Sequence, residues 1–354
     1  MMKIRILAAL AALCLLLGGC GANGNGAASS GAPAQNAPAS EPQGGPAPEE
    51  SPAAQAGYED GVVMRVASLS GPTSMGISQL AVSGNGHYDF QIYTAASEIV
   101  PLLVKGEVDA ALIPANLAAN VCQQTSGGVR ALNINTLGVL EVVAPKSEDV
   151  QGFASLAGRT VYLAATGKGA TPEYAARTLM QAAGLEDTAV TLDFSNPEPA
   201  NVLAALAADP AAIAILPQPF ATVAVQQNEG LEVKFSLSGE WEALMDDGSK
   251  LVTGVTVVRT AFAEEHPAAT AQFALDQAAS VSLVNADPES AGQAIETLGI
   301  VKAPVAAKAI PRCNLVCISG SDLRPALEAY LDTLYGFDPA VVGGAMPDAA
   351  FYLE

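Results

Sequence analysis

From residue 65 onward, short apolar runs of strand character alternate with runs of helical character, and this alternation constrains the fold more than any other feature. Strands and helices that follow one another in this way form parallel sheets covered by helices on both faces. The pattern comes as two successive series with no polar linker between them. The strand-like run 139–144 leads into the second series, and the run 251–258 leads out of it. We therefore expect an α/β protein with two lobes, each a mainly parallel sheet flanked by helices, joined by two crossing strands.

The periodicity also predicts where the elements lie. The first series predicts strands at 65–69, 88–93, 109–113, 131–134 and 139–144, with helices at 72–80, 97–104 and 116–122. The second predicts strands at 160–165, 189–194, 211–216, 231–235 and 251–258, with helices at 172–183, 201–208 and 219–227. The C-terminal part is mostly helical, at 262–284, 288–298 and 321–334, with a short apolar run at 315–318. We assign residues 61–142 and 254–354 to lobe 1 and residues 143–253 to lobe 2.

The N-terminus has the pattern of a bacterial lipoprotein signal. Lys3 and Arg5 precede an apolar run, 6–17, that is too short for a comfortable membrane span. The sequence Leu-Gly-Gly-Cys then ends at Cys20, in the arrangement of a lipobox, where cleavage leaves a lipid-carrying cysteine at the new N-terminus. A plain secretory signal that is cut near a cysteine by chance is the alternative. We expect residues 1–19 to be the signal peptide, and the mature protein to be held outside the cytoplasm, at the cell membrane, by a lipid on Cys20.

Residues 20–60 are expected to form a disordered tether behind that anchor. Between residues 21 and 57 only Gly, Ala, Asn, Ser, Pro, Gln and Glu occur, a composition that cannot bury enough apolar surface to order itself. A flexible chain of this length spans roughly 35 Å. The formal net charge is −20, and losing the two positive charges of the signal makes it about −22. Such a chain repels nucleic acid, which we exclude as a partner.

Signals of metal binding and catalysis are weak. The mature chain holds three further cysteines, Cys122, Cys313 and Cys317, too few for a disulfide framework and without the second ligand pair of a zinc site. We expect them to be small buried hydrophobic residues, and we expect no metal and no cofactor. The only two histidines, His87 and His266, stand in settings typical of surface or capping residues. No catalytic residue is assigned, and the lone tryptophan, residue 241, is expected to be a packing anchor.

Four strand-to-helix loops are distinctive, and two of them belong to lobe 1. The first, SGPTSMG at residues 70–76, has a glycine for a sharp turn and a proline suited to a first helical position. Free N–H groups at such a helix start favour an anion or a carbonyl oxygen. A simple helix-capping role for its hydroxyls is the alternative. In the second loop, Asn116 follows a buried strand and can both donate and accept hydrogen bonds, although it can equally be an N-cap.

The other two loops belong to lobe 2. In TGKGATPEYA (166–175), Lys168 lies between two glycines, and Thr171 and Pro172 suit an N-cap and a first helical position. The loop is not a Walker A motif, because no Ser or Thr follows the Gly-Lys pair. Lys168 either faces the cleft that we expect between the two lobes or is a solvated loop charge. The fourth loop, LPQPF (216–220), is stiffened by two prolines and is expected to present Gln218 and Phe220.

With these loops in order, the chain resembles the solute-binding lipoproteins of bacterial ABC importers, in the nitrate, sulfonate, taurine and thiamine-pyrimidine-precursor class. The stretches that carry the resemblance are GPTSMG (71–76), EIVPLLVKGEVD (98–109), PAN (114–116), NTLG (135–138), GKGATPEY (167–174), LPQPF (216–220), VTGV (252–255) and AIP (309–311). It covers the chain from about residue 62 to the C-terminus. The resemblance implies a type II periplasmic-binding fold whose lobes close on a ligand through hinge motion of the crossing strands.

The resemblance also implies partners, an ABC permease and its ATPase, for a protein that is itself a monomer. From the loops, we expect the ligand to be bound by Ser70, Thr73, Ser74, Met75, Asn116, Thr136, Lys168, Gly169, Thr171, Gln218 and Phe220. Lys168 and the helix starts favour a carboxylate, sulfonate or phosphate, whereas the amide and aromatic side chains favour a flat heterocycle. Two other functions stay open: an enzyme of the same fold that acts on a pyrimidine-type metabolite, and a sensing lipoprotein without a transport role. The enzymes of this class use a cysteine-rich motif and histidines that are missing here.

Overall fold

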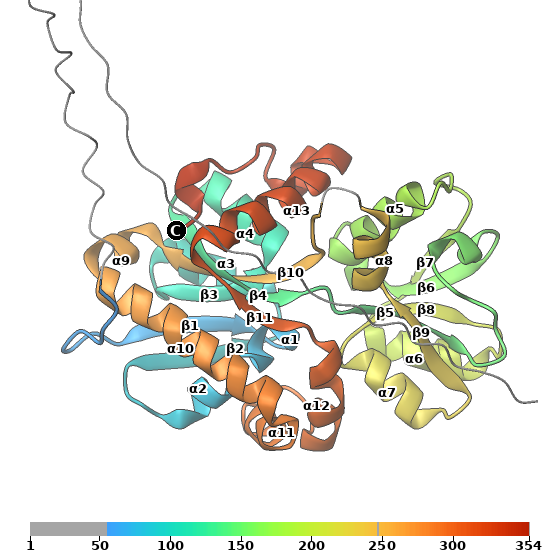
Figure 1. Ribbon diagram of the computed structural model, residues 1–354, viewed down its shortest axis with the longest axis horizontal. Helices are drawn as coiled ribbons and strands as arrows, with labels where there is room; N and C mark the ends of the chain where they lie inside the picture. Colours follow the sequence, from blue (N-terminus) through green and yellow to red (C-terminus); the bar gives the residue numbers. More distant parts are fainter. Residues whose placement is uncertain (1–54, 246–247, 354) are drawn as a thin grey trace, which may run out of the picture. The chain divides into compact units, whose positions relative to one another are not determined.

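The structure, a computed structural model, describes residues 55–245 and 248–353. The expected signal peptide, the lipidated Cys20 and almost all of the tether lie outside the described residues. The elements alternate as the sequence predicts, and they form two mixed sheets with helices on both faces (Figure 1).

The first sheet has six strands in the order β11-β4-β10-β3-β1-β2. Its strands are β1 (Met64–Leu69), β2 (Tyr88–Tyr93), β3 (Ala110–Pro114), β4 (Val129–Leu137), β10 (Val252–Arg259) and β11 (Leu315–Ile318). β1 runs parallel to β2 and to β3, whereas β10 is antiparallel to both β3 and β4, and β11 is antiparallel to β4. The antiparallel members, β10 and β11, are thus the strands that the chain forms after it has left the second sheet.

The second sheet has five strands in the order β7-β6-β8-β5-β9. Its strands are β5 (Leu140–Pro145), β6 (Thr160–Ala164), β7 (Thr191–Asn196), β8 (Ile213–Pro217) and β9 (Leu231–Ser236). β6 is parallel to β7 and β8, and β5 is antiparallel to its two neighbours. The chain leaves the first sheet after Leu137 and enters the second at Leu140, a few residues before the expected boundary at 142. It returns to the first sheet at β10.

Helices fill the connections between these strands. They are α1 (Pro72–Met75), α2 (Ser78–Ser83), α3 (Ala96–Lys105), α4 (Ala115–Gln124), α5 (Thr171–Ala182), α6 (Pro199–Ala208), α7 (Phe220–Gln227), α8 (Leu237–Leu244), α9 (Thr260–Glu265), α10 (Pro267–Ala286), α11 (Pro288–Thr297), α12 (Ala303–Ala309) and α13 (Leu323–Phe337). The predicted helix 262–284 is two helices, because Pro267 disfavours a helical conformation at His266. The predicted helix 72–80 is likewise divided, after Met75. Helices α8 and α12 were not predicted.

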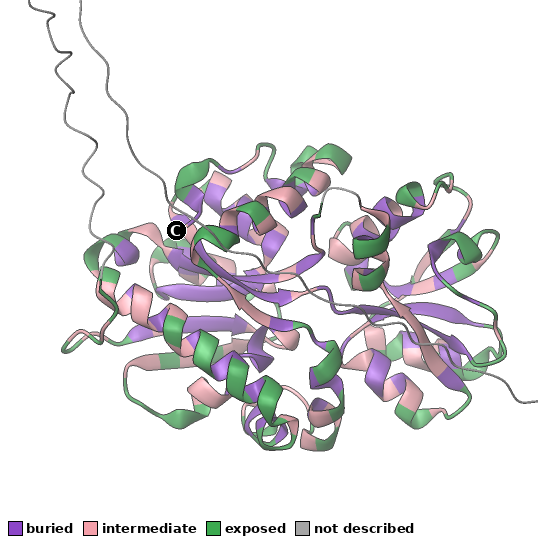
Figure 2. Ribbon diagram, in the orientation of Figure 1, coloured by how far each residue is buried: buried purple, intermediate pink, exposed green. Residues whose placement is uncertain are grey.

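Side-chain alternation along the strands divides the core between the two faces of the first sheet. Val66 and Leu112 pack with Phe273 of α10 on one face, whereas Ala67 and Ile113 belong to a larger cluster with α3, α4 and α13 on the other. Strands β3 and β8, which lie inside their sheets, are buried except at a final proline, which explains their continuous apolar runs (Figure 2). Trp241 is fully buried, as expected of a packing anchor.

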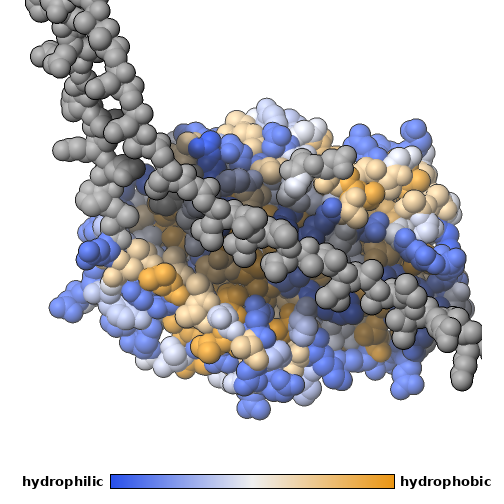
Figure 3. Space-filling view, in the orientation of Figure 1, coloured by the Kyte–Doolittle hydropathy of each residue, from blue (hydrophilic) through white to orange (hydrophobic). Residues whose placement is uncertain are grey.

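Among the described residues, Cys122, Cys313 and Cys317 are free, and the first two are buried, as predicted for small hydrophobic residues. Burial raises the pKa of Cys317 to about 11. None of the helices in the described ranges combines the length and the apolar character that crossing a membrane requires. Apolar side chains do gather on the exposed face of α10 (Figure 3), where Leu275 and Leu283 are each more than half exposed.

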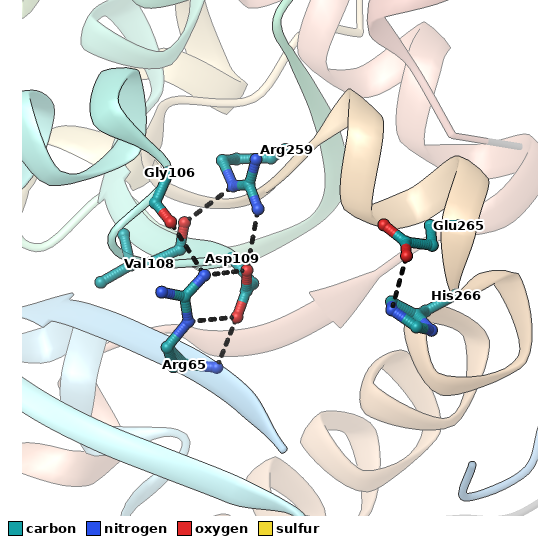
Figure 4. A network of polar contacts seen from close by, with 7 residues as sticks. All are labelled: Arg65, Gly106, Val108, Asp109, Arg259, Glu265 and His266. Atoms are coloured by element: carbon teal, nitrogen blue, oxygen red, sulfur yellow. Dashed lines mark hydrogen bonds and ion pairs between the residues drawn. The ribbon is translucent and has the colours of Figure 1, made fainter. Parts of the chain in front are cut away.

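A carboxylate with two arginine partners joins three strands of the first sheet. Asp109, immediately before β3, accepts hydrogen bonds from the Nε and Nη2 of Arg65 and from its backbone N–H (Figure 4). Arg259, at the end of β10, donates through Nη2 to the same carboxylate at 3.0 Å. The group ties β1 and β10 to the start of β3. It therefore lies at the end of the sheet opposite to the strand ends that carry the predicted loops.

Candidate ligand-binding site

The start of α1 closes the end of β1 with a tight turn. Gly71 is the N-cap, with a φ of 119° that favours glycine, and Pro72 follows as the first helical residue. Thr73 Oγ1 donates to the carbonyl of Leu69 at 2.8 Å, and Ser74 Oγ donates to the same carbonyl at 2.7 Å. These two hydroxyls therefore bond back to the strand rather than capping the helix.

Three strands meet the α1 turn at Gly254. Gly254 of β10 lies between Pro114 of β3 and Thr136 of β4 in the sheet. A Cβ at this glycine would lie 2.3 Å from Thr73 Cγ2 and 2.6 Å from Asn135 Oδ1. The missing side chain thus lets α1 approach the sheet closely. Thr73, Asn135 and Thr136 form a cluster at this point, which we call the strand-end cluster.

The remaining residues expected in lobe 1 differ in exposure. Met75 is fully buried, and its Sδ lies 3.8 Å from Cys313 Sγ in a hydrophobic cluster. Ser74 is also fully buried, and its hydroxyl is 2.6 Å from that of Ser68. Ser70 and Asn116 are half-buried, and Asn116 is the second residue of α4 rather than its N-cap. In the described conformation Ser70 and Asn116 are therefore more accessible than Ser74 and Met75.

In the second sheet, Gln218 is buried rather than presented as we expected. It is only 1% exposed, and its Oε1 accepts a hydrogen bond from Thr222 Oγ1 at 2.7 Å. Its Nε2 is buried without a hydrogen-bond partner among the described residues. Phe220 is the first residue of α7 and packs, partly buried, on the core of that sheet.

Lys168 is exposed, and within the described part of the chain its ammonium group makes no ion pair or hydrogen bond. Its neighbour Gly169 has a φ of 66° and donates its backbone N–H to Glu173 Oε2 at 2.8 Å, so that N–H is already used. Thr171 is the first residue of α5, whose N-cap is Ala170, which corrects the N-cap role expected for Thr171. The loop is thus held by its own helix, with the lysine left pointing outward.

Thr171 faces α13, a helix that packs on β4 and α4 of the first sheet. Burial raises the pKa of Tyr330 in α13, and the side chain of Thr171 opposes this rise. Tyr174 and Phe337 make a second contact between α5 and α13, with ring centroids 5.4 Å apart. The start of α5 thus lies against α13, a helix of the first sheet. This contact does not involve the strand-end cluster.

Two charged residues that we did not predict form a pair that links β5 of the second sheet to the segment before β11 of the first. Glu141 of β5 is 3% exposed, and its Oε1 is 3.6 Å from Nη1 of Arg312, which precedes β11. Burial raises the pKa of Glu141, and Arg312 and Gln218 partly oppose the rise. The sequence did carry one sign of Glu141 as a functional residue, because it is the single acid inside the otherwise apolar run 139–144. Its partner Arg312 is distant in sequence, so only the fold shows the pair.

The raised pKa of Glu141 gives a prediction for stability. A folded-state pKa above the ordinary 4.5 means that the folded protein binds the proton more tightly than the unfolded chain, so stability falls as pH rises through that range. Glu141→Gln removes the titrating carboxyl group, so this loss of stability between pH 5 and pH 7 is expected to disappear in the variant. Urea denaturation of both proteins at pH 5 and pH 7 measures it. A variant whose stability falls between pH 5 and pH 7 as much as that of the parent contradicts the prediction.

A pocket of about 240 Å³ lies where the chain crosses between the sheets. Its walls include Leu137, Ser238, Glu242, Lys250, Leu251 and Asn314. Lys250 Nζ and Glu242 Oε1 are 3.0 Å apart at its edge. None of the ligand-binding residues expected from the sequence lines this pocket. No group of three or more possible metal ligands occurs in the described ranges.

Six of the expected site residues thus lie at three places in the structure. Thr73 and Thr136 meet in the strand-end cluster, and Gln218 lies beside the Glu141–Arg312 pair. Lys168, Gly169 and Thr171 lie at the start of α5, which faces α13. The expected residues at the first two places are uncharged, and the one free cation among the expected residues, Lys168, lies at the third.

Comparisons with known proteins agree with this architecture. The model of the NMT1-like family matches residues 86–299. A crystal structure of an ABC transporter from Parabacteroides distasonis is 20% identical with a TM-score of 0.70, covering 83% of this chain and 99% of its own. The aliphatic sulphonate-binding protein SsuA of Escherichia coli is 14% identical with a TM-score of 0.63, over 81% and 92% of the two chains.

The alkanesulfonate-binding protein SsuA of Xanthomonas axonopodis pv. citri, bound to MOPS, is 14% identical with a TM-score of 0.57, over 82% and 96%. No curated protein matches the sequence. At these identities the likeness establishes the fold, that of periplasmic binding proteins, and the fold class expected from the sequence is confirmed.

Proposed function

The chain belongs to the NMT1-like family, and on this basis we propose that it is the extracytoplasmic solute-binding subunit of an ABC importer. The observation that carries the proposal is the family match, which runs from β2 to α11 and so includes the whole second sheet. The sulfonate-binding proteins of the same fold support it. The protein would act as a monomer that delivers a small solute to a permease driven by an ATPase.

The proposal includes the lobe division expected from the sequence, with residues 61–142 and 254–354 as one lobe and 143–253 as the other. Strand membership supports it, because β6 to β9 share the second sheet and β10 and β11 belong to the first. Capture would occur by closure of the lobes about the two crossing segments. The signal peptide (1–19), the lipid on Cys20 and the tether to residue 60 complete the proposal, and the sequence pattern at the N-terminus supports them.

The ligand would lie against the carboxyl ends of the parallel strands, where α/β proteins bind their ligands. The proposed contacts are Ser70, Thr73, Asn116 and Thr136 on lobe 1, and Lys168, Gly169, Thr171, Gln218 and Phe220 on lobe 2. Ser74 and Met75 would support the turn of α1 from behind, because Ser74 Oγ is hydrogen-bonded to Leu69 and lies against Ser68, and Met75 packs in the cluster around Cys313. Lys168 would contribute the positive charge of the site.

The two histidines support a binding role over a catalytic one. His87 stacks on Tyr58 with ring centroids 3.8 Å apart, and His266 Nδ1 lies 2.8 Å from Glu59 Oε2. Both histidines therefore hold the first described residues of the chain and do not face the strand ends. No observation favours the enzyme alternative.

A direct test is ligand capture with and without the lysine. Ethanesulfonate and 4-aminopyrimidine, one probe of each chemical class, are screened by thermal shift. A ligand at 100 times its Kd stabilises the protein by about 2.7 kcal/mol. If the anion binds, Lys168→Ala is expected to weaken its affinity by about 10- to 100-fold in calorimetry, because one charged hydrogen bond contributes about 1.5–3 kcal/mol.

Lys105→Ala is the matched control. Lys105 is also exposed, but it is the last residue of α3 and lies near the start of β3, away from the strand ends that carry the proposed ligand contacts. Unchanged affinity in Lys168→Ala, or an equal loss in the control, counts against Lys168 as a ligand contact. If neither probe class nor a wider solute library stabilises the protein, the proposed function itself fails.

A further inference from the structure

Gly138 lies at the passage of the chain from the first sheet to the second, with no room for a side chain. A Cβ there would lie 2.3 Å from Ser238 Oγ and 2.7 Å from Leu251 Cδ2. Ser238 belongs to α8, which packs on β5 and β9, and Leu251 lies immediately before β10 on the return passage. The two passages therefore touch each other at Gly138, which makes it the natural pivot for any relative motion of the sheets.

The carbonyl of Gly138 accepts hydrogen bonds from both sides. Ser238 Oγ donates to it at 3.1 Å from the second-sheet side, and Asn314 Nδ2 donates at 2.6 Å from the first-sheet side. Asn314 also accepts the backbone N–H of Leu137 at 3.0 Å. The backbone of Asn314 has a φ of 46°, a left-handed conformation that asparagine tolerates better than most residues.

Arg312, two residues earlier, makes the charged contact to Glu141 across the same passage. Glu141 Oε2 is buried without a hydrogen bond in the described structure, so the carboxylate is only partly satisfied. Rotation of the second sheet about Gly138 would move Glu141 and Ser238 together, away from Arg312 and Asn314. Each of the two contacts therefore depends on the relative position of the sheets.

We propose that the segment Arg312–Asn314 is a latch that biases the opening equilibrium of the two lobes, with Asn314 and Arg312 as positioning residues that touch no ligand. The inference rests on the proposed function, because the latch would set the equilibrium of the lobe closure on which that function depends. By population shift, weakening the latch changes the apparent ligand affinity through the fraction of protein in the competent state.

The lone tryptophan of the chain is a built-in reporter of this equilibrium. Trp241 in α8 is fully buried, and its ring centroid is 6.0 Å from that of Tyr330 in α13, a helix packed on the first sheet. Separation of the lobes would change this contact. The full-length chain labelled with 5-fluorotryptophan therefore gives a single ¹⁹F resonance position for each state, without any ligand present.

The test compares the ligand-free ¹⁹F spectra of three variants and one control variant with that of the parent. Asn314→Gly removes the amide donor and keeps the left-handed backbone accessible. Arg312→Ala removes the ion pair, and Arg312→Lys keeps its charge. Asn314→Gly and Arg312→Ala are each expected to change the ratio of the two resonances about fivefold, the effect of losing one typical hydrogen bond, with Arg312→Lys between them and the parent.

Lys302→Ala is the control, because it removes an ion pair, to Glu296, that joins α11 to the start of α12 and involves no residue of the second sheet. The urea midpoint of each variant separates a shifted opening equilibrium from general destabilisation. Parent-like spectra for both Asn314→Gly and Arg312→Ala overturn the latch, and so does an equal change in Lys302→Ala. Because no ligand is used, a shifted spectrum supports the latch even if every candidate solute fails to bind.

Discussion

Gly254→Val is expected to lower the free energy of unfolding by about 3 kcal/mol and to weaken capture of any solute at the strand ends. The new Cβ would lie 2.3 Å from Thr73 Cγ2 and 2.6 Å from Asn135 Oδ1, separations that real Cβ atoms do not adopt. Either α1 or the end of β4 must therefore move. Both carry proposed ligand contacts, so stability and affinity are expected to fall together in urea denaturation and calorimetry.

Gly336→Ala is the control for this substitution. Gly336 lies in α13, and a Cβ there would meet no heavy atom within 4 Å. Because alanine is the better helix former, the variant is expected to be as stable as the parent or more stable by about 0.5 kcal/mol. A Gly254→Val protein with parental stability would mean that α1 yields easily, and the strand-end cluster would then not be a rigid site.

Asp109→Ala is expected to lower the free energy of unfolding by about 2–3 kcal/mol at pH 7. Asp109 is 3% exposed and is the common acceptor for Arg65 and Arg259. Its loss leaves two guanidinium groups facing each other across the space that the carboxylate filled. The arginines are partly exposed and keep hydrogen bonds to the carbonyls of Gly106 and Val108, which limits the loss.

The same substitution is expected to change the response to acid. Burial raises the pKa of Asp109, but hydrogen bonds from Arg65 and Arg259 outweigh it and hold the pKa below the ordinary 3.8. A lowered pKa gives stability that is complete above the ordinary value and is lost as pH falls through the folded-state value. Urea titrations between pH 2 and pH 5, a range set by that ordinary value, should therefore show a smaller acid-induced loss in Asp109→Ala.

Glu107→Ala serves as the control, because Glu107 is exposed and its Oε1 lies 3.9 Å from Lys105 Nζ. An exposed pair of this kind contributes at most about 0.5 kcal/mol. If Asp109→Ala is no more harmful than Glu107→Ala, the arginine-linked carboxylate does not tie the strands together.

Much of the fold was predictable because local sequence carries its cause. The run 88–93 forms a strand with the predicted bounds, and the helix expected at 97–104 closes at Lys105-Gly106 with the left-handed glycine that such an end favours. Errors came where one residue interrupts a pattern, as Pro267 does, or where short elements give little periodicity, as in α8 and α12. The strand-to-helix loops were located correctly, but the exposure of their side chains was not, since Gln218 and Met75 are buried.

The sequence by itself determined the α/β alternation, the two series and the positions of the loops, because backbone propensity and apolar periodicity act over a few neighbouring residues. Only the tertiary structure decided which distant residues meet. Glu141 and Arg312 are far apart along the chain, as are Gly138 and Asn314, yet each pair is in contact near the passage between the two sheets. No local pattern encodes such pairs, because their energies depend on the burial and geometry that arise only when the strands take their order in the sheets.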